Sequence, residues 1–411
     1  MITVYGFICF ILAIVGKTTE KNLFNPVTVF MVLWGGILIL SNLHLYNLST
    51  ANIKYYNLIF VAIIAYFIGY YIINIVVRDK NITNSKFNDI KDSDYELRYG
   101  LFYILQIVSI LFCAKDLIKV IGSLSGNYSL HNVQKLLQST NNFFERTSLE
   151  NAIRFFIINP FSWIYNPVVI IDFWIGKRDK KALVLAIILT CMRVLTTGGR
   201  ASIIHAAFCF ACVFFLSIGK KNIDVSKKNI DLLRKNKKTF IFLGIIVILA
   251  LAIATWSRAS KNALRTIYYD FAMQPMMFQN WAQIVDVQNI KGYGIATFNG
   301  ILSDIDYLLR NTIHIELPNL YKEVYELIAK TDTVWLSIGD GVFANAYVTI
   351  FWFFYLDGRV FGIILCMFVF GSISKLVYRG VTKKHNLKNM AVYSLFLLGI
   401  FYSFAFWNFA Q

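Results

Sequence analysis

Residues 193–202 combine two arginines and two glycines in a way that could bind an anion. The string reads Arg-Val-Leu-Thr-Thr-Gly-Gly-Arg-Ala-Ser and joins two apolar stretches. Gly198 and Gly199 permit a tight turn, and Arg200 then stands at the start of a helix, where the dipole opposes a cation. Capping does not explain Arg200, whereas free amides beside an arginine form an anion site. Arg193 lies about one turn inside a stretch able to cross a membrane, where an ionisable residue is costly and indicates function. The alternative is that both arginines extend to lipid headgroups.

A second basic cluster follows the next apolar stretch, in residues 256–265. If the helix continues there, Arg258, Lys261 and Arg265 are spaced by three, four and seven residues and share one face. Three like charges repel one another unless an anion bridges them. The alternative is a solvated helix end at a membrane interface. Positive groups in two separate segments favour a ligand that carries a diphosphate.

A third cluster supplies groups able to accept a proton. Residues 303–316 contain Asp304, Asp306 and His314, with Arg310 between them as a further candidate for diphosphate binding. Burial and neighbouring charges could tune one of the first three into a general base. The alternative is an ordinary amphipathic surface helix. Asp-x-Asp lacks the further carboxylates of a closed oxygen cage, so we expect no metal site, and no cofactor motif is present.

The composition places these residues in a polytopic membrane protein. Hydrophobic residues make up 57% of the 411 and charged residues only 15%, against roughly 25% charged in soluble domains. A soluble enzyme is thereby excluded, and abundant aromatics exclude disorder. The six cysteines lie in apolar stretches and are interpreted as small core residues. Because exposed strands cannot satisfy their backbone in lipid, the expected fold is all-α. The predicted spans, ten in number, are 1–15, 24–41, 55–77, 99–118, 152–175, 182–197, 200–218, 239–256, 360–377 and 390–408.

The net charge is +17, and the positions of the basic residues predict the orientation of the chain in the membrane. Lysine and arginine concentrate in four connecting segments, which the positive-inside rule assigns to the cytoplasm. These segments are 78–98, 176–181, 219–238 and 378–389. The excess is therefore topological, and no nucleic-acid partner is expected. Both termini then face outward, and 342–356 is interpreted as a re-entrant or outer-face segment and not as a span. The predicted organisation is eight spans in 1–256, a large outer loop in 257–359 and two final spans in 360–411.

This pattern resembles the Wzy-type polymerases of O-antigen and other oligosaccharide repeat units. The resemblance rests on the Thr-Thr-Gly-Gly-Arg200-Ala-Ser string between spans, on the late outer loop, and on the tail in 345–362. That tail carries aromatics before Asp357-Gly-Arg-Val-Phe-Gly, similar to the family's aromatic–Asp-Phe-Gly–x-x-Gly element, with Arg359 in place of the usual apolar residue.

The resemblance implies a glycosyltransferase of the bacterial inner membrane whose site faces the periplasm. Its substrates would be a donor and an acceptor that are both oligosaccharides linked to undecaprenyl diphosphate, and it would need no cofactor. Arginine and lysine would stabilise the diphosphate leaving group, and an aspartate or histidine would accept the hydroxyl proton. Membrane lipid and a chain-length regulator protein are the other expected partners. The alternatives are the related O-antigen ligase and a flippase or other transporter of lipid-linked oligosaccharide.

Overall fold

The computed structural model describes residues 1–77, 97–125, 144, 146–197, 201–218, 263–383 and 386–410. This part of the chain is helical apart from one two-stranded hairpin. It divides into two compact units. Unit 1 comprises Met1–Ile82, Leu264–Arg379 and Gly399–Gln411, and unit 2 comprises Thr83–Ala263 and Gly380–Leu398. Each unit is described by itself below.

Unit 1 is built on long apolar helices that pack closely through glycines. They are α1 (Ile2–Glu20), α2 (Pro26–Ser41), α3 (Ile53–Val76) and α16 (Thr349–Lys383), with the last residues of α17 (Leu387–Tyr402) and the short η1 (Leu45–Asn47) and η3 (Asn408–Ala410). A Cβ atom on Gly69 of α3 would lie 2.0 Å from the Phe368 carbonyl oxygen of α16, and one on Gly371 would lie 2.1 Å from the Tyr66 oxygen. Small residues that let two backbones approach in this way are typical of membrane helix pairs.

A sharp break divides α16 into two parts. Gly358 and Arg359 leave the helical conformation, and Arg359 has φ 55° and ψ −139°. The two turns before the break, 350–356, are apolar and buried on every side. A helix that is apolar all round must be enclosed, and here the enclosure is protein. The strongly apolar range 342–356 therefore contains two elements. They are the strand β2 (Val342–Ala344) and, from Thr349, the enclosed start of α16.

The rest of unit 1 is a set of short helices and the hairpin. These elements are α12 (Ala263–Ala272), α13 (Gln274–Gln288), α14 (Asn299–Thr312), α15 (Asn319–Thr333), and β1 (Leu336–Gly339), which pairs antiparallel with β2. The aromatic side chains of Trp281 and Trp352 meet in the core at 5.9 Å between ring centroids. The range predicted as a large outer loop thus forms helices and packs aromatic side chains from residue 263 onward.

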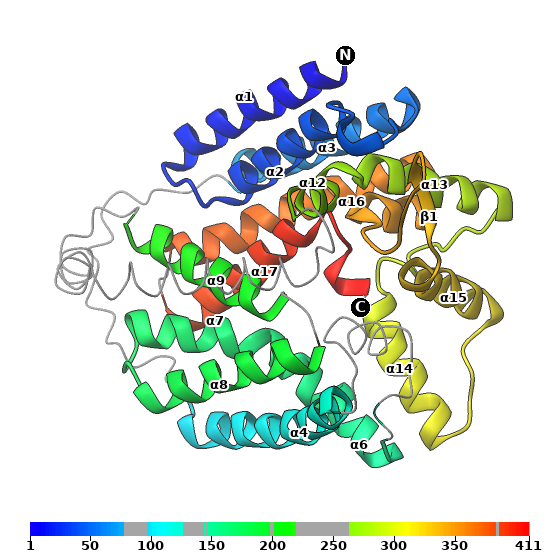
Figure 1. The fold of residues 1–411 in the computed structure, drawn as a ribbon. Coiled ribbons are helices and arrows are strands. Elements are labelled where there is room, and N and C mark those ends of the chain that lie inside the picture. The colour runs from blue at the N-terminus through cyan, green and yellow to red at the C-terminus, as the bar shows by residue number, and fades with distance from the viewer. Residues whose placement is uncertain are drawn as a thin grey trace. The chain divides into compact units, whose positions relative to one another are not determined.

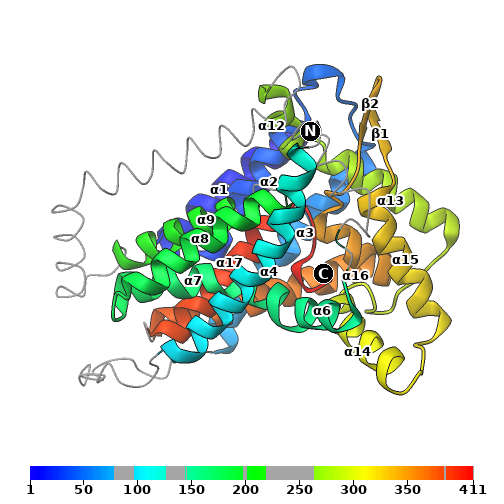
Figure 2. The same ribbon diagram turned by 60° about the horizontal axis from the view of Figure 1, so that its bottom comes forward.

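Unit 2 is a bundle of helices that lie side by side in both ribbon views (Figures 1 and 2). Its elements are α4 (Tyr99–Ser125), α6 (Ser148–Ile153), the π-helical turn η2 (Arg154–Ile158), α7 (Asn159–Ile175), α8 (Lys180–Thr197), α9 (Ala201–Ile218) and most of α17. The helix α8 packs against α4, α7 and α9. Tyr99 and Tyr103 of α4 donate hydrogen bonds of 2.6 Å to Asp172 and Asp179, which fixes α4 along the α7–α8 connection.

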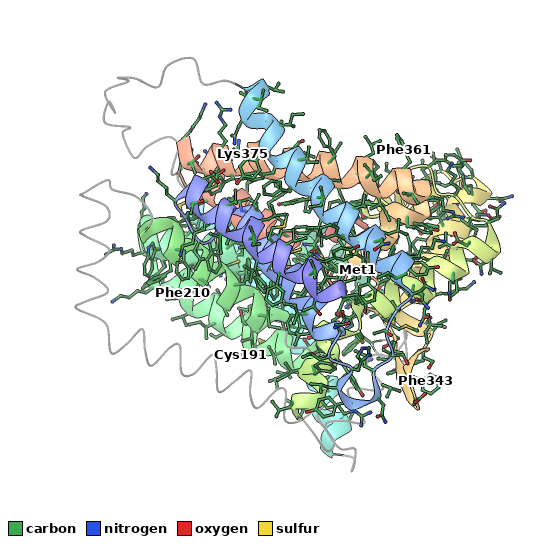
Figure 3. The ribbon with its side chains drawn as sticks, turned by 90° about the horizontal axis from the view of Figure 1, so that it is seen from above. Met1, Cys191, Phe210, Phe343, Phe361 and Lys375 are labelled. Atoms are coloured by element: carbon green, nitrogen blue, oxygen red, sulfur yellow. The ribbon has the colours of Figure 1, made fainter. Side chains whose placement is uncertain are left out.

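Within the described ranges, five helices are long and apolar enough to cross a membrane, namely Ile2–Glu20, Ile53–Val76, Tyr99–Ser123, Ser148–Trp174 and Thr349–Lys383. Several of them leave apolar stripes uncovered. On α1 the exposed residues Val4, Phe7, Ile11 and Ile14 recur at helical spacing, and Phe361 of α16 is 71% exposed on the outer side of the helix (Figure 3). Such faces fit lipid better than water. By helix length and hydropathy, the chain has the features of a multi-pass membrane protein.

The all-α expectation is confirmed for the described residues, apart from the hairpin, whereas the count of ten spans stays a prediction. Pro26–Ser41, Ser202–Leu216 and Leu387–Tyr402 are apolar helices of less than spanning length. The span predicted at 239–256 and the basic segment 219–238 lie outside the described residues. Among the cysteines, Cys191 is exposed and does not fit the interpretation of all six as core residues (Figure 3).

Candidate anion-binding site

Three arginines and one aspartate come together inside unit 2. Asp116 lies on α4, Arg146 immediately precedes α6, Arg154 opens the π-helical turn η2, and Arg193 lies on α8. The Arg146 guanidinium donates a hydrogen bond of 2.6 Å from Nη2 to Asp116 Oδ2. Arg154 lies near enough to the other three residues for their charges to act on it. We call these four residues the arginine cluster.

Local structure explains why the arginine cluster forms at this place. A capping box starts α6 directly after Arg146: the Thr147 hydroxyl accepts from the Glu150 amide, and the Glu150 carboxylate accepts from the Thr147 amide at 3.0 Å. This box fixes the direction in which the chain enters the bundle. The wider turn at η2 then places Arg154 beside α4, which η2 contacts. Single π-helical turns are frequent at functional sites because they redirect side chains.

The charges of the arginine cluster do not balance. Three guanidinium groups and one carboxylate leave two positive charges in excess. The Arg146 side chain is only 8% exposed and that of Asp116 is 21% exposed; Arg154 and Arg193 are half-buried. Within the described parts of unit 2, no hydrogen-bond acceptor or carboxylate pairs with the guanidinium of Arg154 or Arg193. Because a buried cation without a partner is costly, the arrangement suits an anion with two negative charges.

Polar groups continue from Arg193 into the bundle. Its charge acts on His205 of α9 and on Tyr165 of α7. The Tyr165 hydroxyl lies 2.9 Å from the Thr190 hydroxyl, and Thr190 in turn lies 3.3 Å from Asn166 Oδ1. The Asn166 side-chain amide nitrogen is buried and has no acceptor among the residues described. These groups extend the arginine cluster with hydrogen-bonding capacity.

The predicted basic residues divide between the two units and the undescribed segments. Arg193 belongs to the arginine cluster. Arg200, Arg258 and Lys261 lie outside the described residues, so their predicted grouping remains a prediction. Arg265, on α12 in unit 1, is exposed and donates from Nε to the Tyr269 hydroxyl at 3.0 Å.

The three predicted proton acceptors lie on or just after α14 in unit 1. Asp306 forms an ion pair with Arg310 one turn later, with 2.9 Å between Oδ2 and Nε, so each neutralises the other. His314 follows the helix with φ 53°, is exposed, and places Nδ1 3.1 Å from the Arg310 carbonyl oxygen. Asp304 is exposed and has no ion pair with the residues described, and partial desolvation raises its pKa above the ordinary aspartate value. Asp304 is therefore the most available carboxylate of this group.

Asp357, in the tail that resembles the polymerases, has a structural role. Its carboxylate accepts hydrogen bonds from the Ala296 amide at 2.9 Å, the Thr297 amide at 2.7 Å and the Thr297 hydroxyl at 2.5 Å. A Cβ atom on Gly292 would lie 2.3 Å from Asp357 Oδ1, so glycine is needed there. Arg359 donates to the Val285 carbonyl oxygen at 3.0 Å. This element thus holds the loop before α14 against the break in α16.

Sequence reasoning missed Asp116, Arg146 and Arg154. Asp116 lies within the predicted span 99–118 and Arg154 within 152–175, so the rule that selected Arg193, an ionisable residue inside a span, applies to both. Arg146 lies in a predicted loop and carried no such signal. Within the described ranges, no three histidine, cysteine, aspartate or glutamate side chains gather as a possible metal site. No protein-family model, curated protein or solved structure matches the chain.

Proposed function

We propose that this chain is a glycan polymerase of the bacterial inner membrane. It would transfer a growing oligosaccharide from its polyprenyl diphosphate to a hydroxyl group of the next lipid-linked repeat unit, at the periplasmic side. The observation that carries the proposal is the arginine cluster, where two excess positive charges lie half-buried in apolar helices. A diphosphate esterified at both ends carries two negative charges and matches that excess.

The chemistry of such a transfer suits arginine. The acceptor hydroxyl oxygen attacks the anomeric carbon of the donor while the bond from that carbon to the diphosphate oxygen breaks. The electron pair of the broken bond leaves on the lipid diphosphate, where negative charge therefore grows. Guanidinium groups can contact two phosphate oxygens at once, and they act more strongly where water is excluded. Arg154 and Arg193, which have no acceptor within the described residues, are the groups we assign to this role.

The attacking hydroxyl must also lose a proton to a base. Asp306 is neutralised by Arg310, and the His314 ring lies against the Arg310 carbonyl group. Asp304 of unit 1 stays our predicted base, on the sequence pattern together with its exposed carboxylate and a pKa that desolvation raises toward neutral pH. This assignment retains one of the three residues that the sequence suggests.

The proposed membrane topology keeps the basic segments in the cytoplasm and the range 257–359 outside. Exposed apolar stripes on the long helices support insertion in a bilayer. The enclosed first part of α16 supports the assignment of 342–356 to the protein interior and not to a lipid-exposed span. We propose ten spans on this basis, with undecaprenyl diphosphate-linked donor and acceptor, and without a metal or organic cofactor.

A deletion strain that produces one defined surface glycan tests the proposal. We expect loss of the gene to leave single repeat units on the surface, because the ligase step persists, whereas loss of a ligase would leave none. Wild-type protein restores a ladder of chain lengths, and Arg154→Gln with Arg193→Gln does not, at equal protein level in the membrane. Arg379→Gln is the control, since this half-buried arginine donates to the Val77 carbonyl oxygen in unit 1. A full ladder from the double variant would overturn the proposal.

A further inference from the structure

Asp116 places a negative charge inside a site that otherwise attracts anions. Its carboxylate lies 2.6 Å from Arg146, and it acts electrostatically on Arg154 as well. This carboxylate weakens the binding of anions, because Asp116 repels each negative charge of the ligand. The pair is also only slightly exposed, at 8% and 21% of the two side chains, so water screens that repulsion weakly.

The donor and the product of the proposed reaction differ in charge at the diphosphate. The donor is esterified at both ends and carries one negative charge on each phosphorus. Transfer of the glycan frees the terminal phosphate of the product, which gains most of a third charge because the second ionisation of a phosphate monoester occurs near pH 6. Asp116 therefore meets two negative charges before transfer and close to three after it.

From this difference we infer that Asp116 is a specificity-determining residue that weakens the hold of the arginine cluster on the product more than on the donor. The inference rests on the proposed function, because it concerns the same diphosphate site. Each additional charge on the ligand adds one further repulsion with Asp116, whereas the three arginines alone would bind the more highly charged product more tightly. The carboxylate thus favours release of the lipid diphosphate after each transfer.

Two soluble probes separate these ligand classes. A short dialkyl diphosphate represents the donor end, and the corresponding monoalkyl diphosphate represents the product. Binding of each is measured by titration calorimetry on the purified full-length protein in detergent at pH 8. We expect Asp116→Asn to raise the affinity for the monoalkyl probe about tenfold more than for the dialkyl probe, equivalent to about 1.4 kcal/mol. Asp116→Glu keeps the charge and should keep the wild-type ratio.

The matched control is Glu150→Gln. Glu150 pairs with Lys115, which is 53% exposed, and glutamine preserves the capping box. This variant should leave the ratio unchanged. Asp116→Thr removes the charge with a different shape, in case asparagine impairs folding. If both probes bind but neither Asp116→Asn nor Asp116→Thr changes their ratio, the role of Asp116 is refuted while the anion site stands. If neither probe binds to the wild-type protein, the proposed function loses its diphosphate site and the inference falls with it.

Discussion

Replacement of Glu20 by glutamine tests the buried ion pair that joins the end of α1 to α16 in unit 1. Lys375 Nζ lies 2.6 Å from Glu20 Oε1, and the two side chains are 10% and 12% exposed. The Lys375 ammonium also lies 4.9 Å from the Tyr70 ring centroid and 5.8 Å from that of Tyr378 (Figure 3). The lysine is thus enclosed by aromatic rings, with one carboxylate as its counter-ion.

The size of the expected effect follows from this geometry. At an effective dielectric constant of about 20, two unit charges at this separation attract each other by roughly 6 kcal/mol, and much of that offsets their desolvation. Removal of one partner leaves the other charge buried and uncompensated, which costs about 3–5 kcal/mol. We expect Glu20→Gln to lower the free energy of unfolding by that amount. The double variant Glu20→Gln with Lys375→Met removes both charges and should recover most of the loss.

Denaturant unfolding of the purified protein in detergent measures these differences. Glu323→Gln on α15 is the control, because an exposed glutamate replaced in this way should change the free energy of unfolding by less than about 0.5 kcal/mol. The reasoning is refuted if Glu20→Gln stays within about 1 kcal/mol of the wild type. The single variant Lys375→Met is measured as well. The reasoning is equally refuted if the double variant loses as much free energy of unfolding as the two single variants added together, since independent sites are additive.

Two further predictions concern helix packing and the proposed base. Gly69→Ala should separate α3 from α16, because its Cβ atom would lie 2.0 Å from the Phe368 carbonyl oxygen. In the same unfolding assay this variant should lose about 3 kcal/mol or more, at the upper end of overpacking penalties. Gly36→Ala is the matched control, because a Cβ there meets nothing within 4 Å. This variant should raise the free energy of unfolding by up to about 1 kcal/mol. Equal effects of Gly69→Ala and Gly36→Ala would contradict the close contact of α3 with α16. Desolvation raises the pKa of Asp304, so as pH falls its carboxylate is protonated, and transfer activity lost, at a higher pH than an ordinary aspartate would give. Asp304→Asn should abolish glycan transfer at every pH. If this variant instead stays active with the wild-type pH–rate profile, Asp304 is ruled out as the base.

Hydropathy revealed the helices but not their surroundings. The range 342–356 is apolar because the first part of α16 is enclosed by protein, and periodicity cannot distinguish that enclosure from contact with lipid. The loop charges indicated that this range is not an ordinary span, although they contained no information on the break at Gly358 and Arg359. Directly before that break, Asp357 accepts hydrogen bonds from the amides of Ala296 and Thr297 some sixty residues earlier, a contact that no local pattern encodes.

The candidate site was predictable only in part for the same reason. Arg193 was found because a cation inside an apolar stretch is conspicuous by itself. Asp116, Arg146 and Arg154 come from three other segments, and their meeting with Arg193 depends on the packing of α4, η2 and α8. On α14, by contrast, local spacing could have indicated the Asp306–Arg310 pair, which we did not predict, since residues four apart on a helix are neighbours.

Glycan transfer by the purified protein tests the central claim most directly. The protein in detergent is given one defined repeat unit linked to polyprenyl diphosphate, and the products are separated by size. The account predicts a ladder of chain lengths with released lipid diphosphate for the wild type, and unreacted single units for the variant in which Arg154 and Arg193 are both glutamine. A folded wild-type protein that binds the lipid-linked unit yet forms no longer chain would contradict the account, as would a ladder of wild-type length from the double variant.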